Sequence, residues 1–105
     1  MPRIVLITCP DLASARSLGR ALVDQRLAAC VNVIPGVTSI YRYEGAVHED
    51  SEVLLVCKTV EERVEALEEA LRELHPYDVP ECVTLAPSRV EQKYLEWLTG
   101  ETRLG

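Results

Sequence analysis

The chain has 105 residues, of which 48% are hydrophobic and 27% are charged. This length and composition fit one compact domain over residues 1–105. Its 11 Lys and Arg residues against 17 Asp and Glu residues give a net charge of −6, which poorly suits a protein that must neutralise nucleic-acid phosphates. No apolar run approaches the ~20 residues of a membrane-spanning helix, and no secretion signal is recognisable. We therefore expect a cytoplasmic protein without nucleic-acid or membrane partners.

The first predicted elements are a strand, a helix and a long extended segment. Residues 3–9 are a continuous apolar run with β-branched residues, which predicts a central strand covered on both faces. Asp11 is the expected N-cap of a helix that continues to about Leu27, because apolar residues recur there at three- and four-residue spacing. Residues 29–43 indicate a strand with a bulge or bend at Pro35-Gly36, since proline cannot donate to a strand ladder.

The second half of the chain predicts a hairpin, a helix, a short strand and a last helix. A glycine-containing loop at residues 44–46 leads to a partner strand at residues 52–59. An amphipathic helix follows and stops before Pro76, and residues 80–86 indicate a fourth strand.

Two capping boxes are predicted at the starts of the later helices. Thr59 and Glu62 have the required spacing for the first of them, and Ser88 and Glu91 for the second. In each pair the hydroxyl and the carboxylate are expected to satisfy amides that are left free at the helix start.

The element order is β-α-β-β-α-β with an added C-terminal helix. This order is typical of the ferredoxin-like, split βαβ arrangement of the α+β class. Right-handed crossovers then predict an antiparallel sheet in the order 4-1-3-2, with both main helices on one face. The arrangement hosts many functions, so the function must be argued from individual residues.

Four cysteines stand at positions 9, 30, 57 and 82, each in an apolar stretch and none in a Cys-x-x-Cys pair. We predict that they are reduced and mostly buried. Cys9 is the expected exception, with the most reactive thiol.

Strand directions in this fold bring Cys9, His75 and Glu81 to one edge of the sheet. A thiol, an imidazole and a carboxylate together suit copper or zinc as ligands. The alternative interpretation is structural: Cys9 is a packed strand end, His75 stops a helix and Glu81 is a solvated charge. Both interpretations stay open at the level of the sequence.

Other chemistry has less support. With His48 and His75 as the only imidazoles, no catalytic triad is recognisable.

Several separate motifs resemble those of one family, the CutA divalent-cation tolerance proteins. They occur in the same order along nearly the whole chain, at residues 27–32, 35–41, 58–59, 75–81 and 94–98. The resemblance implies a cytoplasmic, non-enzymatic homotrimer of ferredoxin-like subunits, linked to tolerance of copper and other divalent metals. It also implies an architecture similar to PII-type signalling proteins, so a trimer that binds a small molecule or a protein partner in its inter-subunit clefts is the alternative function. Lys58, at the end of the third strand, is a candidate for lining such a cleft with Tyr77 and Glu81, although Lys58 also fits an exposed strand-end charge.

The metal ligands of the family carry over only in part. His75 is in place, but two ligand positions of some relatives are occupied by Ile7 and Leu74. Cys9 lies two residues beyond the first of these positions and is the candidate substitute. We therefore expect weak binding of Cu(II) or another divalent metal at His75, Cys9 and Glu81.

The long second strand predicts self-assembly. Residues 29–43 would extend over roughly 50 Å at ~3.3 Å per residue, whereas a domain of this size is only ~35 Å across. The hairpin should therefore overhang its own helices and expose an unpaired edge. We expect Tyr41, Tyr43 and Trp97 at the subunit interface, and the family resemblance sets the number of subunits at three.

Overall fold

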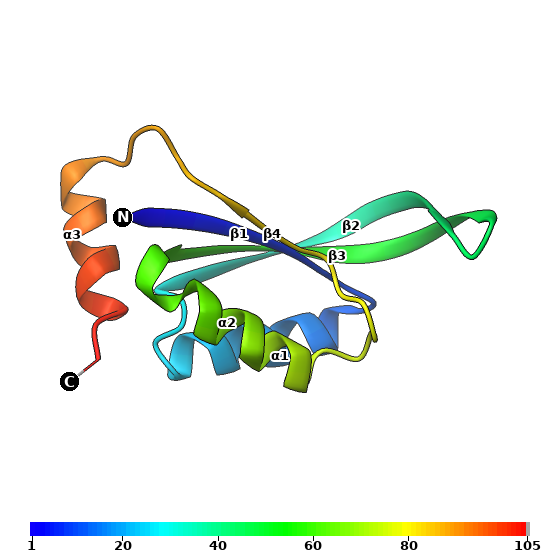
Figure 1. Ribbon diagram of the computed structural model, residues 1–105, viewed down its shortest axis with the longest axis horizontal. Coiled ribbons are helices and arrows are strands. Elements are labelled where there is room, and N and C mark those ends of the chain that lie inside the picture. Colours follow the sequence, from blue (N-terminus) through cyan, green and yellow to red (C-terminus); the bar gives the residue numbers. More distant parts are fainter. Residues whose placement is uncertain (105) are drawn as a thin grey trace.

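The computed structural model describes residues 1–104 (Figure 1). In chain order the elements are β1 (Pro2–Cys9), α1 (Leu12–Asp24), β2 (Cys30–Tyr43), β3 (Ala46–Val60), α2 (Glu61–Leu74), β4 (Cys82–Leu85) and α3 (Gln92–Glu101). The strands form one sheet in the order β2-β3-β1-β4, and neighbouring strands are antiparallel. The predicted split βαβ fold and its strand order are confirmed.

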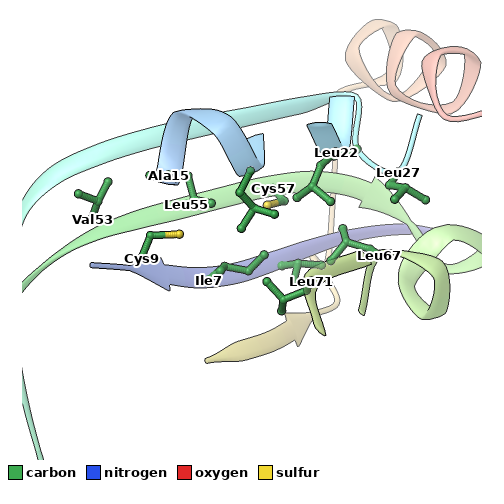
Figure 2. Close-up of a cluster of buried hydrophobic side chains, with 13 residues drawn as sticks. Ile7, Cys9, Ala15, Leu22, Leu27, Val53, Leu55, Cys57, Leu67 and Leu71 are labelled. Carbon is green, nitrogen blue, oxygen red and sulfur yellow. The ribbon is translucent and has the colours of Figure 1, made fainter. Parts of the chain in front are cut away.

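The core lies between the sheet and the two main helices. Both α1 and α2 cover the same face of the sheet, and α3 lies at the end where β1 begins (Figure 1). Alternate residues of β1 point into this layer, so Val5, Ile7 and Cys9 are fully buried. They pack with Leu22 of α1 and Leu71 of α2 (Figure 2).

Helix α1 begins as predicted and ends earlier. The Asp11 carboxylate accepts a hydrogen bond from the Ser14 amide at 2.7 Å, which caps the helix. The helix ends at Asp24, short of the predicted Leu27, because Arg26 takes a left-handed φ of 59°. Leu27 then returns to the helix and donates its N–H to the Leu22 carbonyl.

Both predicted capping boxes are wrong. Thr59 lies inside β3, and its buried hydroxyl donates to the Leu27 carbonyl at 2.6 Å. Helix α2 therefore begins at Glu61, and its Val60 N-cap offers no side-chain hydrogen bond. At the start of α3 the cap is Glu91, whose carboxylate accepts from the Tyr94 amide, and Ser88 lies outside the helix.

The β2-β3 hairpin is longer than predicted. Strand β3 begins at Ala46, six positions before the expected start at residue 52, because Glu44 and Gly45 form a two-residue turn with φ of 51° and 80°. Pairing runs on to Tyr43 and Ala46 at the tip, with the expected irregularity between Ile34 and Val37. The ribbon accounts for a long axis of 44 Å against 27 and 21 Å (Figure 1).

The Thr59 hydroxyl supplies the first test. Thr59→Val keeps the side-chain volume and removes the hydrogen bond to the Leu27 carbonyl, so we expect the free energy of unfolding to fall by about 1–2 kcal/mol. Thr99→Val, at an exposed position of α3, is the matched control and should change it by less than about 0.5 kcal/mol. Denaturant titrations at one protein concentration measure both values, and equal losses in the two variants would contradict the assignment.

Candidate functional site

His75 is the residue at which α2 ends, and it is buried. Its amide donates to the Leu71 carbonyl as the C-cap of the helix, and Pro76 follows. The extended backbone at His75 turns the chain towards the end of β1, which brings the imidazole beside Thr8 and Cys9. The predicted convergence of Cys9 and His75 at one sheet edge is thus present in the structure.

Both ring nitrogens of His75 already have hydrogen-bond partners. The Tyr77 amide donates to Nδ1 at 3.0 Å, so Nδ1 must carry a lone pair. The neutral imidazole then carries its proton on Nε2, which donates to the Thr8 carbonyl at 2.7 Å. A metal ion would have to displace one of these bonds, because it needs a free imidazole lone pair.

The Cys9 thiol lies 3.8 Å from His75 Nε2 and is fully buried. Burial, together with the nearby carboxylates of Asp11 and Glu52, raises its pKa to about 11. The thiol is therefore protonated at neutral pH, whereas metal ligation needs the thiolate. The expectation that Cys9 is the exception among the buried cysteines is wrong: Cys9 and Cys57 are buried, whereas Cys30 and Cys82 retain some exposure.

Glu81 is exposed in the segment before β4. Within residues 1–104, no three or more His, Cys, Asp and Glu side chains are grouped so that they could hold a metal ion. The Cys9–His75 pair has one protonated thiol and an imidazole with both nitrogens engaged, and so it does not fit a resident metal ion. The pair instead has a structural role, because its contacts hold the end of β1 against the end of α2.

The two cleft candidates lie far apart. Lys58 Nζ donates to the Asn32 side-chain oxygen near the end of β3. Tyr77 donates its hydroxyl to Glu52 at 3.0 Å, and burial and that carboxylate raise the pKa of Tyr77 to about 12. Lys58 lies six positions along β3 from Glu52, a distance of roughly 20 Å. Within one subunit the structure therefore does not bring Lys58 and Tyr77 into one site, and their place in an inter-subunit cleft stays a prediction.

The most extensive unassigned surface is the face of the sheet opposite α1 and α2, which we call the outer face. Strand alternation and register give it a mostly apolar set of side chains: Ile4, Leu6, Ile34, Leu54, Val56, Val83 and Leu85. Neither main helix covers it (Figure 1). The sequence carried a signal for this face, because the continuous apolar run of β1 predicted cover on both sides.

The predicted interface residues are all accessible in the single chain. Tyr41 is 42% exposed on the ribbon, where its ring stacks on His48 and its hydroxyl donates to Asp50. Tyr43 on the ribbon and Trp97 on α3 are exposed as well. Large aromatic side chains left in water on an overhanging ribbon are typical of surfaces that another chain covers.

Comparison with known proteins finds relatives along almost the whole chain. Residues 3–101 match the family described as CutA1 divalent ion tolerance protein. The divalent-cation tolerance protein CutA of Thermus thermophilus is 49% identical over 102 residues, which cover 97% of this chain and 99% of the relative. Protein CutA of Homo sapiens is 46% identical over 92 residues, or 88% of this chain. The chain spans only about half (51%) of the length of that human relative.

Solved structures share the fold at the same level. The divalent cation tolerance protein of Thermus thermophilus superposes with a TM-score of 0.95 at 48% identity, covering 98% of this chain and 100% of that chain. CutA1 from Oryza sativa superposes with a TM-score of 0.95 at 40% identity, covering 99% of this chain and 95% of that chain.

Among the helices of residues 1–104, none is long and apolar enough to cross a membrane.

Cysteine reactivity tests the buried position of Cys9. With its pKa at about 11, Cys9 should react with a thiol reagent at pH 8 about 100-fold more slowly than in the denatured protein, because the thiolate reacts. Cys57, whose pKa burial raises to about 12, should also be slow. Peptide mass spectrometry after timed labelling gives each rate, and a native Cys9 rate equal to that of Cys82 would contradict the structure.

Replacement of His75 separates the structural from the metal-binding interpretation. His75→Ala leaves the Thr8 carbonyl and the Tyr77 amide without their partner, so the free energy of unfolding should fall by about 1–3 kcal/mol. Calorimetric titration with Cu(II) and Zn(II) should give the same affinity as for the unaltered protein. His48→Ala, which removes an exposed imidazole, is the control. Loss of metal affinity in His75→Ala alone would restore the predicted metal site.

Proposed function

Since the chain belongs to the CutA1 family of divalent ion tolerance proteins, we propose that it acts as one subunit of a homotrimer in the tolerance of divalent cations such as copper. The observation that carries the proposal is the uncovered apolar outer face of the sheet. A two-layer domain normally buries the apolar faces of its sheet within the fold. Here Ile34, Val83 and Leu85 remain 43–46% exposed on that face.

Covering this face with a second copy supplies the missing layer. Each buried apolar Å² contributes roughly 25 cal/mol, so a face with side chains from all four strands is a substantial driving force. The occupant is best another copy, because the same chain also leaves two strand edges unpaired. Strands β2 and β4 are the two edges of the sheet.

The two edges support a head-to-tail assembly. The ribbon part of β2 pairs only with β3, and β4 pairs only with β1 over four residues. If the ribbon of one copy lies along the β4 edge of the next, the interface is heterologous, and it forms a ring when the rotation between copies returns to the first one. This arrangement covers Tyr41 and Tyr43 of the ribbon. The number three comes from the family resemblance.

The proposed role is binding and tolerance without catalysis. The Cys9–His75 pair supports the non-catalytic part of this role, because a protonated, fully buried thiol is no nucleophile. Contact with Cu(II) at His75 would cost one of the two ring hydrogen bonds, so any such binding is weak. Free thiols at all four cysteines support a reducing, cytoplasmic compartment.

A cationic pocket beside Lys58 favours a second candidate function. A PII-like trimer that binds a small molecule would use such a pocket. This function and metal tolerance make different demands, because the first needs a site for an anion and the second a site for a cation.

Assembly is tested by mass. Light scattering at micromolar concentration should give about three times the subunit mass of 11.7 kDa. Tyr41→Asp and Leu85→Asp should shift the protein towards monomer, because each buries a charge at the proposed interface. Leu12→Asp is the matched control: Leu12 is as exposed as Tyr41, at 43%, but lies on the helical layer. A monomer mass for the unaltered protein, or equal dissociation in all three variants, would contradict the assembly.

A further inference from the structure

A pocket of about 260 Å³ lies on the outer face of the sheet, at the end where α3 packs. Ile4 and Lys58 form part of its lining and are register partners in β1 and β3. Arg89, in the connection from β4 to α3, and Tyr94 of α3 also line the pocket. These elements come together because α3 lies beside the start of β1 (Figure 1).

The lining of the pocket is cationic in a protein that is acidic as a whole. Arg3, Lys58 and Arg89 belong to it, and its other lining residues are Pro2, Ile4, Pro87, Val90, Tyr94 and Leu98. The lining found in the described chain thus includes three cations and no carboxylate, whereas the chain carries a net charge of −6. A local positive potential inside an apolar wall attracts an anion.

The charges of these three side chains are compensated to different extents. Arg3 donates from Nε to Glu61 at 2.7 Å and from Nη1 to the Pro2 carbonyl, so it is held in place and largely neutralised. Lys58 is half-buried and donates to an amide oxygen of Asn32, which leaves its charge uncompensated. Among the ion pairs of residues 1–104, none involves Lys58 or Arg89. A half-buried, uncompensated ammonium gains from an anionic partner.

We propose that this pocket binds a small organic anion, with its carboxylate or phosphate group between Lys58 and Arg89. The apolar part of the ligand lies against Ile4 and Tyr94. The volume is below the ~300–1,000 Å³ of pockets for drug-sized ligands, so the ligand is a compact one. This assignment refines the second candidate function by giving its ligand class. All residues that line the pocket belong to one subunit, so its test is separate from that of the trimer, and the proposal requires that the neighbouring copy leaves the α3 end of the outer face open.

The test uses three small probes that share a phenyl ring, added to the purified assembly at low ionic strength. Benzoate and phenyl phosphate carry the two anionic groups, and benzyl alcohol is the neutral analogue. Calorimetric titration should detect at least one anion and no benzyl alcohol, and the tighter anion identifies carboxylate or phosphate as the natural group. Added salt should weaken binding, because the contact is ionic. Failure of both anions to bind would overturn the proposal.

Two variants locate the binding. Lys58→Met keeps the aliphatic stem and removes the charge, and we expect it to weaken binding by about tenfold or more. Arg89→Gln, in an exposed connection, should weaken binding by a similar factor without affecting the fold. Lys93→Met, on α3 but outside the pocket lining, is the matched control and should bind as the unaltered protein does. Equal affinity in all four proteins would overturn the assignment, as would a structure of the assembly with a partner carboxylate between Lys58 and Arg89. Light scattering on the same samples scores the trimer independently.

Discussion

The sheet has apolar side chains on both faces, while the fold has helices for only one of them. The inner face is filled by α1 and α2 around Val5 and Ile7. The outer face, with Ile4 and Leu6 from the same strand, has only α3 at one end (Figure 1). Burial of apolar surface is the main favourable contribution to both folding and association, so one constraint links the fold of the subunit to its assembly. The overhanging ribbon and the two unpaired strand edges likewise leave surface and backbone groups that a second copy would cover.

The contact between Cys9 of β1 and His75 at the end of α2 shows that packing can make two potentially reactive side chains unreactive. A cysteine and a histidine side by side are a common start for a metal site or a nucleophile. Here the hydrogen bonds of His75 to Thr8 and Tyr77 satisfy both ring nitrogens, and burial keeps the Cys9 thiol protonated. Buried polar groups are satisfied within the fold because an unpaired one costs about 1–3 kcal/mol. The pair therefore holds two elements together at the place where a ligand site was expected.

Charge is distributed unevenly over the molecule. Carboxylates dominate the exposed side of α2, as at Glu65 and Glu69, where water solvates them. Near α3, Lys58 and Arg89 line an apolar pocket without a carboxylate of its own. Net charge governs long-range attraction and solubility, whereas a ligand responds to the groups within a few Å of it. An acidic protein can thus contain an anion site, and the overall charge of −6 argues only against extended polyanions such as nucleic acid.

The periodicity of the sequence by itself determined the element order, the sheet topology, the Asp11 cap and the bulge after Ile34. These features depend on residues close in sequence, and the handedness of crossovers then restricts the topology. Only the tertiary structure decided the role of Thr59, because its hydroxyl bonds to Leu27, which is 32 positions away, instead of the adjacent helix start. It likewise decided the tautomer of His75 through Thr8, 67 positions away, and the separation of Lys58 from Tyr77. A buried hydrogen-bonding group pairs with whichever group the fold places beside it. The spacing of neighbouring residues in the sequence does not identify that partner.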